Sequence, residues 1–68
     1  MIRCHLSRIM GENKMKIADV ARETGLNRST VTALYNETAT RIDLETIEKL
    51  CTLFKCPIGE LLELVRQN

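Results

Sequence analysis

The sequence predicts a small all-α domain of five short helices, and three observations support this prediction. Apolar residues recur through most of the chain at the three- and four-residue spacing of amphipathic helices. The chain has 68 residues, which is enough for one domain with a small core. Only 3% of the residues are aromatic, so the core must be built from aliphatic side chains. We therefore treat residues 1–68 as a single compact domain.

A first helix is expected over about residues 5–12, where Leu6 and Met10 lie one helical turn apart. Before it, Met1 to Cys4 show a faint period-two pattern, with Ile2 and Cys4 on one side, as a short edge strand would. The prediction therefore allows, at most, one short ribbon that pairs the two ends of the chain.

Two helical patterns flank a Gly-Leu-Asn turn within residues 17–36. The first runs from about Ile17 to Thr24, and the second runs from about Arg28 to Asn36. Gly25 follows the first helix, where a left-handed backbone is expected, and Asn27 is suited to cap the second. Helices separated by so few residues must cross at a steep angle, which is the helix-turn-helix arrangement.

The second helix of this motif has two different faces. Val31 and Leu34 have the spacing of core residues. The opposite face has small and hydrogen-bonding side chains and no carboxylate, which suits the floor of a DNA major groove. The first residues of such a helix reach base edges, and arginine can read guanine with two hydrogen bonds. We expect five residues to read bases: Arg28, Ser29, Thr30, Thr32 and Ala33.

A fourth helix is expected to start after Asp43 as its N-cap and to end near Phe54. Its predicted apolar stripe consists of Leu44, Ile47, Leu50, Cys51 and Phe54. Pro57 is suited to the first position of a fifth helix.

The end of the chain has more apolar residues than one face of a short helix can bury, at Leu61, Leu62, Leu64 and Val65. Two explanations stay open. One is a homodimer contact through Leu61, Leu64 and Val65, with Ile2 added. The other is a C-terminal strand that pairs with Ile2 to Cys4.

The motif resembles that of the lambda-repressor-like regulators, also called the XRE or Cro-type family. The resemblance is carried by Val20, Ala21, Gly25, Leu26, Val31 and Leu34, together with the closing run Ala33 to Asn36. Two later segments, Ile42 to Ile47 and Cys56 to Leu62, look like the fourth and fifth helices of small members. The resemblance covers nearly all of the chain, and it implies a five-helix domain that binds double-stranded DNA.

This family also has residues that hold the DNA backbone. Many members have glutamine after the cap of the second helix, where it contacts a phosphate. This chain has Ile17 there, which leaves Lys16 as the replacement. Glu37 is expected to point to solvent, because a carboxylate beside a phosphate is unfavourable. Six residues are expected at phosphates: Lys16, Asn27, Asn36, Thr38, Thr40 and Arg41.

Charge and cysteine usage narrow the function further. The formal net charge is only +1, but residues 14–41 have five basic and three acidic residues, whereas residues 43–68 have three and five. The three cysteines and the single histidine match no metal-binding motif, and no catalytic pattern is present. We therefore expect neither an enzyme nor a cofactor or metal. The absence of a signal peptide and of an apolar run near 18 residues predicts a cytoplasmic protein with no membrane contact.

The leading interpretation is a sequence-specific DNA-binding regulator that represses by occluding a promoter, because the sequence has no separate effector domain. The alternative is an antitoxin or another protein-interaction module that uses the same fold. The weak net charge, Glu37 and the missing glutamine favour this alternative. Its partner would be a protein, with or without DNA.

Overall fold

The computed structural model describes residues 1–66, so the last two residues of the predicted domain, Gln67 and Asn68, lie outside the described residues. In chain order the elements are β1 (Ile2–Cys4), α1 (Leu6–Glu12), α2 (Ile17–Thr24), α3 (Arg28–Tyr35), α4 (Leu44–Phe54), α5 (Ile58–Leu61) and β2 (Leu62–Leu64). The prediction of five helices is confirmed. The description as all-α is only approximate, because the two strands form a small sheet.

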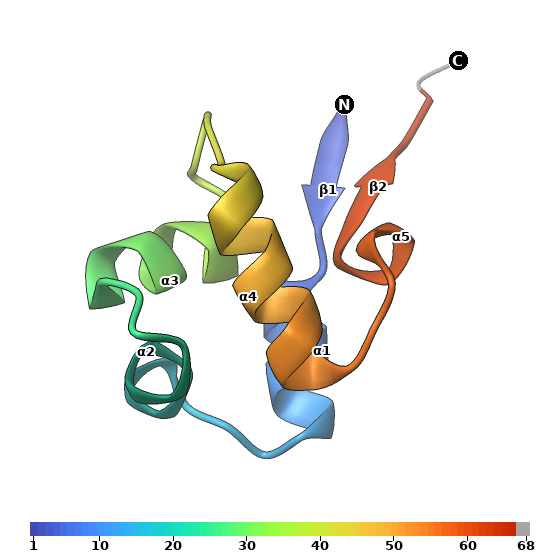
Figure 1. Ribbon diagram of the computed structural model, residues 1–68. Coiled ribbons are helices and arrows are strands. Elements are labelled where there is room, and N and C mark those ends of the chain that lie inside the picture. Colours follow the sequence, from blue (N-terminus) through green and yellow to red (C-terminus); the bar gives the residue numbers. More distant parts are fainter. Residues whose placement is uncertain (67–68) are drawn as a thin grey trace.

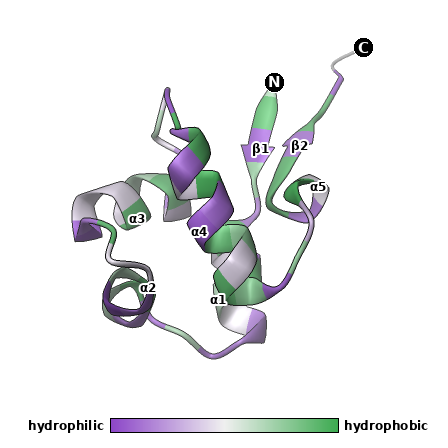
Figure 2. Cartoon of the chain, in the orientation of Figure 1, coloured by the Kyte–Doolittle hydropathy of each residue, from purple (hydrophilic) through white to green (hydrophobic). Residues whose placement is uncertain are grey.

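The helices surround one aliphatic core. Helix α4 crosses the middle of the domain, with α2 and α3 on one side and the ribbon and α5 on the other (Figure 1). Hydrophobic and hydrophilic residues alternate around α4, as an amphipathic helix requires (Figure 2). The largest fully buried side chains come from all five helices: Leu6, Met10, Val20, Val31, Leu50 and Leu61. Among residues 1–66, no helix has the length and apolar content needed to cross a membrane.

The ribbon joins the two ends of the chain. Strands β1 and β2 are antiparallel, and Ile2 lies opposite Leu64 while Cys4 lies opposite Leu62. The ribbon continues one residue further, where the Val65 N–H donates to the Met1 carbonyl at 2.8 Å. The explanation that the surplus of apolar residues forms a C-terminal strand is therefore correct. Three-residue strands are too short to show a period-two pattern clearly, which is why the sequence left this question open.

Two details of the predicted helices were wrong. Leu44 was placed in the apolar stripe of α4, but its side chain is 82% exposed because it starts the helix beyond the edge of the core. The buried face begins instead with Thr46 and Ile47. Pro57 is the N-cap of α5 with an extended backbone, so the helix begins one residue later, at Ile58.

Candidate nucleic-acid interface

The turn between α2 and α3 has the geometry that the sequence predicts. Gly25 adopts a left-handed backbone with φ of 76°, and its N–H donates to the Ala21 carbonyl at 2.9 Å. Only glycine takes this conformation without steric cost. Asn27 is the N-cap of α3, but its side chain makes no capping hydrogen bond. The turn is therefore fixed by the glycine, by the apolar contacts of the two helices, and by the Leu26 N–H, which donates to the Thr24 hydroxyl at 3.2 Å.

The buried sides of α2 and α3 meet in the core. Val20 and Val31 are fully buried, and Ala21 and Leu34 are nearly so. The small side chain of Ala21 lets the two backbones approach each other. These contacts fix which face of α3 points outward.

The start of α2 is held by an acidic side chain. The Asp19 carboxylate accepts a hydrogen bond from the backbone N–H of Lys16 at 2.9 Å and a second from Arg22 at 3.2 Å. The bond from the Lys16 backbone, with a smaller contribution from the Arg22 charge, holds the pKa of the Asp19 carboxyl below its usual value. Asp19 thus compensates for lysine, which is a poor N-cap. The side chain of Lys16 is exposed.

The outer face of α3 lies beside an open groove of about 550 Å³. Helix α3 contributes Ser29, Thr30 and Ala33 to the groove. The turn contributes Asn27, and the loop between α3 and α4 contributes Arg41. The structure therefore brings together three of the predicted base-reading residues and two of the predicted phosphate ligands.

The remaining predicted residues do not line this groove. Arg28 is exposed and lines a second hollow, of about 440 Å³, together with Lys16. Thr32 is half-buried on α3, and Asn36 is exposed at its C-cap. The second hollow therefore places Arg28, the first residue of α3, near Lys16, the N-cap of α2.

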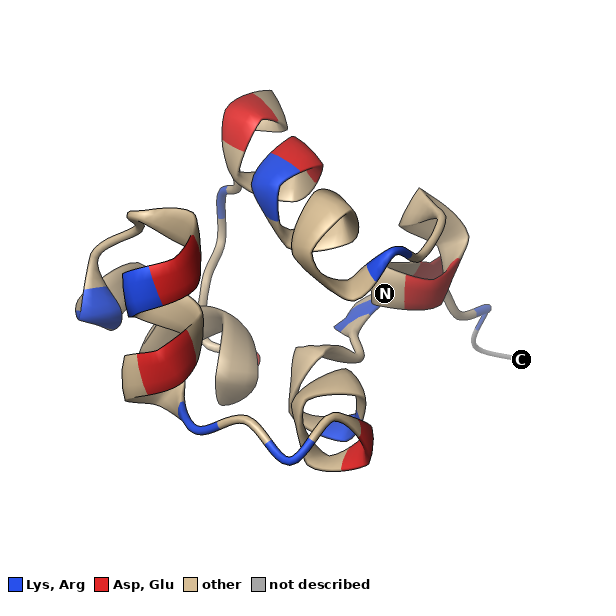
Figure 3. Cartoon of the chain, turned by 60° about the horizontal axis from the view of Figure 1, so that its bottom comes forward, with Lys and Arg blue, Asp and Glu red and all other residues tan. Residues whose placement is uncertain are grey.

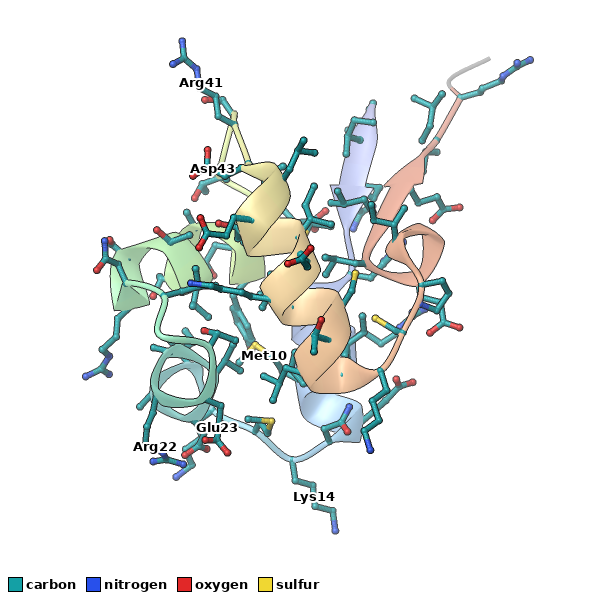
Figure 4. The ribbon with its side chains drawn as sticks, viewed as in Figure 1. Met10, Lys14, Arg22, Glu23, Arg41 and Asp43 are labelled. Atoms are coloured by element: carbon teal, nitrogen blue, oxygen red, sulfur yellow. The ribbon has the colours of Figure 1, made fainter. Side chains whose placement is uncertain are left out.

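The loop from residue 37 to residue 42 extends away from the body of the domain. The Arg41 side chain points outward from its tip, whereas Asp43 lies below it at the start of α4 (Figure 4). Thr40 is exposed, and the Thr38 hydroxyl lies 3.4 Å from the Ala33 carbonyl. Arg41 is exposed, and Asp43 lines the same groove.

Acidic and basic residues are interspersed on α2 and α4 (Figure 3). Lys14 and Lys16 fall between the end of α1 at Glu12 and the start of α2 at Ile17. Positive charge on this part of the domain is therefore local rather than spread over one face. This distribution is consistent with the small net charge of +1.

Glu37 is exposed, as predicted, but its carboxylate is paired with Arg3 and is not in contact with solvent alone. Its carboxylate accepts hydrogen bonds from the Arg3 side chain at 2.8 Å and 3.0 Å. It also accepts one from the backbone N–H of Cys4 at 3.1 Å. The sequence offered no signal for the role of Arg3, because 34 residues separate the two side chains.

The predicted dimer residues divide into two groups. Leu61 is fully buried in the domain's own core, because α5 packs it beneath the ribbon, so its assignment to an interface was wrong. Ile2 and Leu64 are opposite each other in the ribbon and are 63% and 68% exposed. Val65 is half-buried. The free end of the ribbon therefore presents two adjacent apolar side chains to solvent.

Comparison with known proteins agrees with this geometry. A search of curated proteins finds no match to the chain. Residues 5–67 match the family described as the Cro/C1-type HTH DNA-binding domain. The match includes every helix and the whole turn between α2 and α3. The resemblance to the Cro-type regulators is thereby confirmed, and the chain belongs to the Cro/C1-type helix-turn-helix DNA-binding domains.

Proposed function

We propose that this protein is a sequence-specific regulator of transcription that binds double-stranded DNA as a homodimer. It represses by occluding a promoter, and it acts in the cytoplasm, where its cysteines stay reduced. The main support is the outer face of α3, whose hydroxyl-bearing and small side chains border a groove with Arg41 at its edge. Such a face matches the donor and acceptor pattern of a major groove.

In this proposal the residues act in two groups. Arg28, Ser29, Thr30, Thr32 and Ala33 read base edges. Lys16, Asn27, Asn36, Thr38, Thr40 and Arg41 hold the phosphates on either side. Phosphate contacts fix the position of the protein on the duplex, and base contacts give specificity. Selection of binding sites from random duplexes, read by sequencing, tests the proposal, and enrichment of one consensus is the expected result.

The homodimer is proposed to form through the free end of the ribbon, at Ile2, Leu64 and Val65. Within residues 1–66 each strand pairs with one other strand. The outer edge of β1 is occupied at Cys4, whose N–H donates to Glu37, so the outer edge of β2 is the one proposed to meet a second copy. A dimer with two-fold symmetry would place its two α3 helices about 34 Å apart, on successive major grooves.

Replacing Leu64 by aspartate is expected to raise the dissociation constant of the dimer by at least about tenfold, because each copy would bury an unpaired charge. Sedimentation equilibrium measures this constant. Leu44→Asp is the matched control, since Leu44 is also exposed but starts α4. A wild-type protein that stays monomeric at high concentration, and binds each half-site independently, would contradict the dimer.

Replacing Arg41 by alanine is expected to weaken binding to all duplexes alike. The Arg41 charge displaces condensed counterions, so its loss should flatten the slope of log affinity against log salt by about 0.9. Fluorescence anisotropy across a salt series measures the slope. Lys55→Ala is the control, because Lys55 follows the far end of α4. Equal slopes for the wild type and Arg41→Ala would remove Arg41 from the phosphate contacts.

One observation favours the alternative of an antitoxin or interaction module. Asp43 lines the same groove as Arg41, and a carboxylate there opposes a phosphate. A groove with both charges also suits a protein partner. If the intact protein binds no duplex at low salt, the interaction module replaces the regulator as the better explanation.

A further inference from the structure

Helix α3 ends in a cap at which glycine is favoured. Glu37 follows the C-cap and has a left-handed backbone with φ of 58°. Its N–H donates to the Leu34 carbonyl at 3.3 Å, and the Thr38 N–H donates to the Ala33 carbonyl at 2.9 Å. This pair of bonds is the Schellman motif, in which glycine is favoured because a side chain strains the backbone. Lys14 and Lys55 have the same left-handed backbone after α1 and α4, so Glu37 is distinguished by the contacts of its side chain and not by its backbone.

The side chain of Glu37 joins the end of α3 to β1. One carboxylate oxygen accepts from the Arg3 Nε at 2.8 Å and from the Cys4 N–H at 3.1 Å, and the other accepts from the Arg3 Nη2 at 3.0 Å. The Arg3 pair, followed by the Cys4 bond, also holds the pKa of the Glu37 carboxyl below its usual value. A guanidinium that donates two bonds to one carboxylate fixes direction as well as distance.

The rest of the loop is separated from the ribbon. A hollow of about 220 Å³ lies between Ile2, Cys4 and Leu62 on one side and Ala39, Thr40 and Arg41 on the other. Apolar packing therefore does not fill the space between the ribbon and the tip of the loop. The carboxylate of Glu37, which also lines this hollow, bridges the two segments.

We propose that Glu37, paired with Arg3, is a positioning residue that holds residues 38–41 in the orientation that specific DNA binding requires. This inference rests on the proposed function. Strand β1 also carries Ile2, so the same link connects the proposed dimer contact to the recognition helix. Pairing with Arg3 has a second effect, because it offsets the negative charge of Glu37 near the phosphates.

Two possible roles of Glu37, one through its charge and one through positioning the loop, predict different results for the Glu37→Gly variant. This variant keeps the helix cap, relieves the backbone strain and removes a negative charge. If charge alone mattered, binding to every duplex would improve and the preference for the selected site would not change. If Glu37 positions the loop, the ratio of specific to non-specific affinity falls although the repulsion is gone.

The experiment measures dissociation constants for a selected duplex and an unrelated one with the full chain. The proteins are the wild type, Arg3→Gln, Glu37→Gly and the double variant. Specificity is the dissociation constant for the unrelated duplex divided by that for the selected duplex. This ratio is expected to fall about tenfold in each single variant, because the phosphate contacts would be misplaced. The double variant should lose no more than the worse single variant, because one link is broken in each. Glu45→Gln is the matched control, since it breaks the ion pair of Glu45 with Lys49 on α4.

A ratio in Glu37→Gly within about twofold of the wild type would overturn the proposal, and so would losses that multiply in the double variant. Amide hydrogen exchange gives a readout without DNA. In Glu37→Gly the Cys4 amide loses its acceptor and should exchange at least about threefold faster, whereas an unchanged rate would show that the link does not hold β1. A third outcome is that the Cys4 amide exchanges faster in Glu37→Gly while the wild-type protein binds no duplex. The link between Glu37 and β1 would then be real, but both its positioning role and the proposed function would be overturned.

Discussion

Replacing Leu50 by alanine is expected to lower the free energy of unfolding by about 2–5 kcal/mol, the range for a buried leucine. Leu50 is fully buried on α4, in the core cluster that also contains Leu6, Val20 and Leu61. Truncation removes its apolar contacts and leaves a cavity that the surrounding helices fill only in part. Typical domains are stable by only about 5–15 kcal/mol, so this single change should remove a large share of the stability. Urea denaturation followed by circular dichroism measures the loss.

Glu48→Ala is the matched control for this prediction. Glu48 is on the same helix but is exposed, and its replacement should change stability by no more than about 0.5 kcal/mol. Equal denaturation midpoints for Leu50→Ala and Glu48→Ala would show that the burial of α4 is assigned to the wrong face. The comparison therefore tests the phase of the helix and not only its existence.

The bounds of α2 and the steep turn after it could be predicted because local chemistry specifies them. A glycine at the end of α2 and helical spacing on both sides are enough to place the turn, and the structure gives Gly25 a positive φ. The N-cap positions of α3 and α4 were also predicted. However, neither Asn27 nor Asp43 makes a side-chain capping hydrogen bond. The helix starts were therefore predicted correctly, but side-chain capping is not what fixes them.

The end of the chain could not be assigned from local pattern alone. Four apolar residues within five positions do not show which of them is buried, because burial depends on a strand that is more than 50 residues away in sequence. Helix α5 has only four residues, so it provides little periodicity. Leu61 entered the core and Leu64 stayed exposed because β2 starts directly after α5.

In the candidate interface, too, the features specified by local sequence could be predicted, whereas those that depend on distant residues could not. The outward face of α3 followed from helical spacing, and the structure places Ser29, Thr30 and Ala33 beside one groove. The link between Glu37 and Arg3 did not follow, because no local rule pairs a loop residue with a strand near the N-terminus. The proposed base-reading and phosphate-binding roles remain predictions.

Arg28 is positioned differently from the other proposed base-reading residues. It is the first residue of α3, its side chain is exposed, and it lines the hollow that also contains Lys16. The first turn of a recognition helix is the part that reaches base edges. A planar guanidinium there can donate two hydrogen bonds to the O6 and N7 atoms of guanine.

Replacing Arg28 by alanine is therefore expected to cost about 1–3 kcal/mol of binding free energy on the preferred site and to relax the preference at one base pair. The loss of charge also weakens binding to any duplex, so affinity alone does not separate base reading from a phosphate contact. The deciding measurement is a repeated selection from random duplexes, with Arg66→Ala as the control because Arg66 is exposed beyond β2. If Arg28→Ala selects the same consensus as the wild type, Arg28 does not read a base, and its contribution is limited to the phosphates.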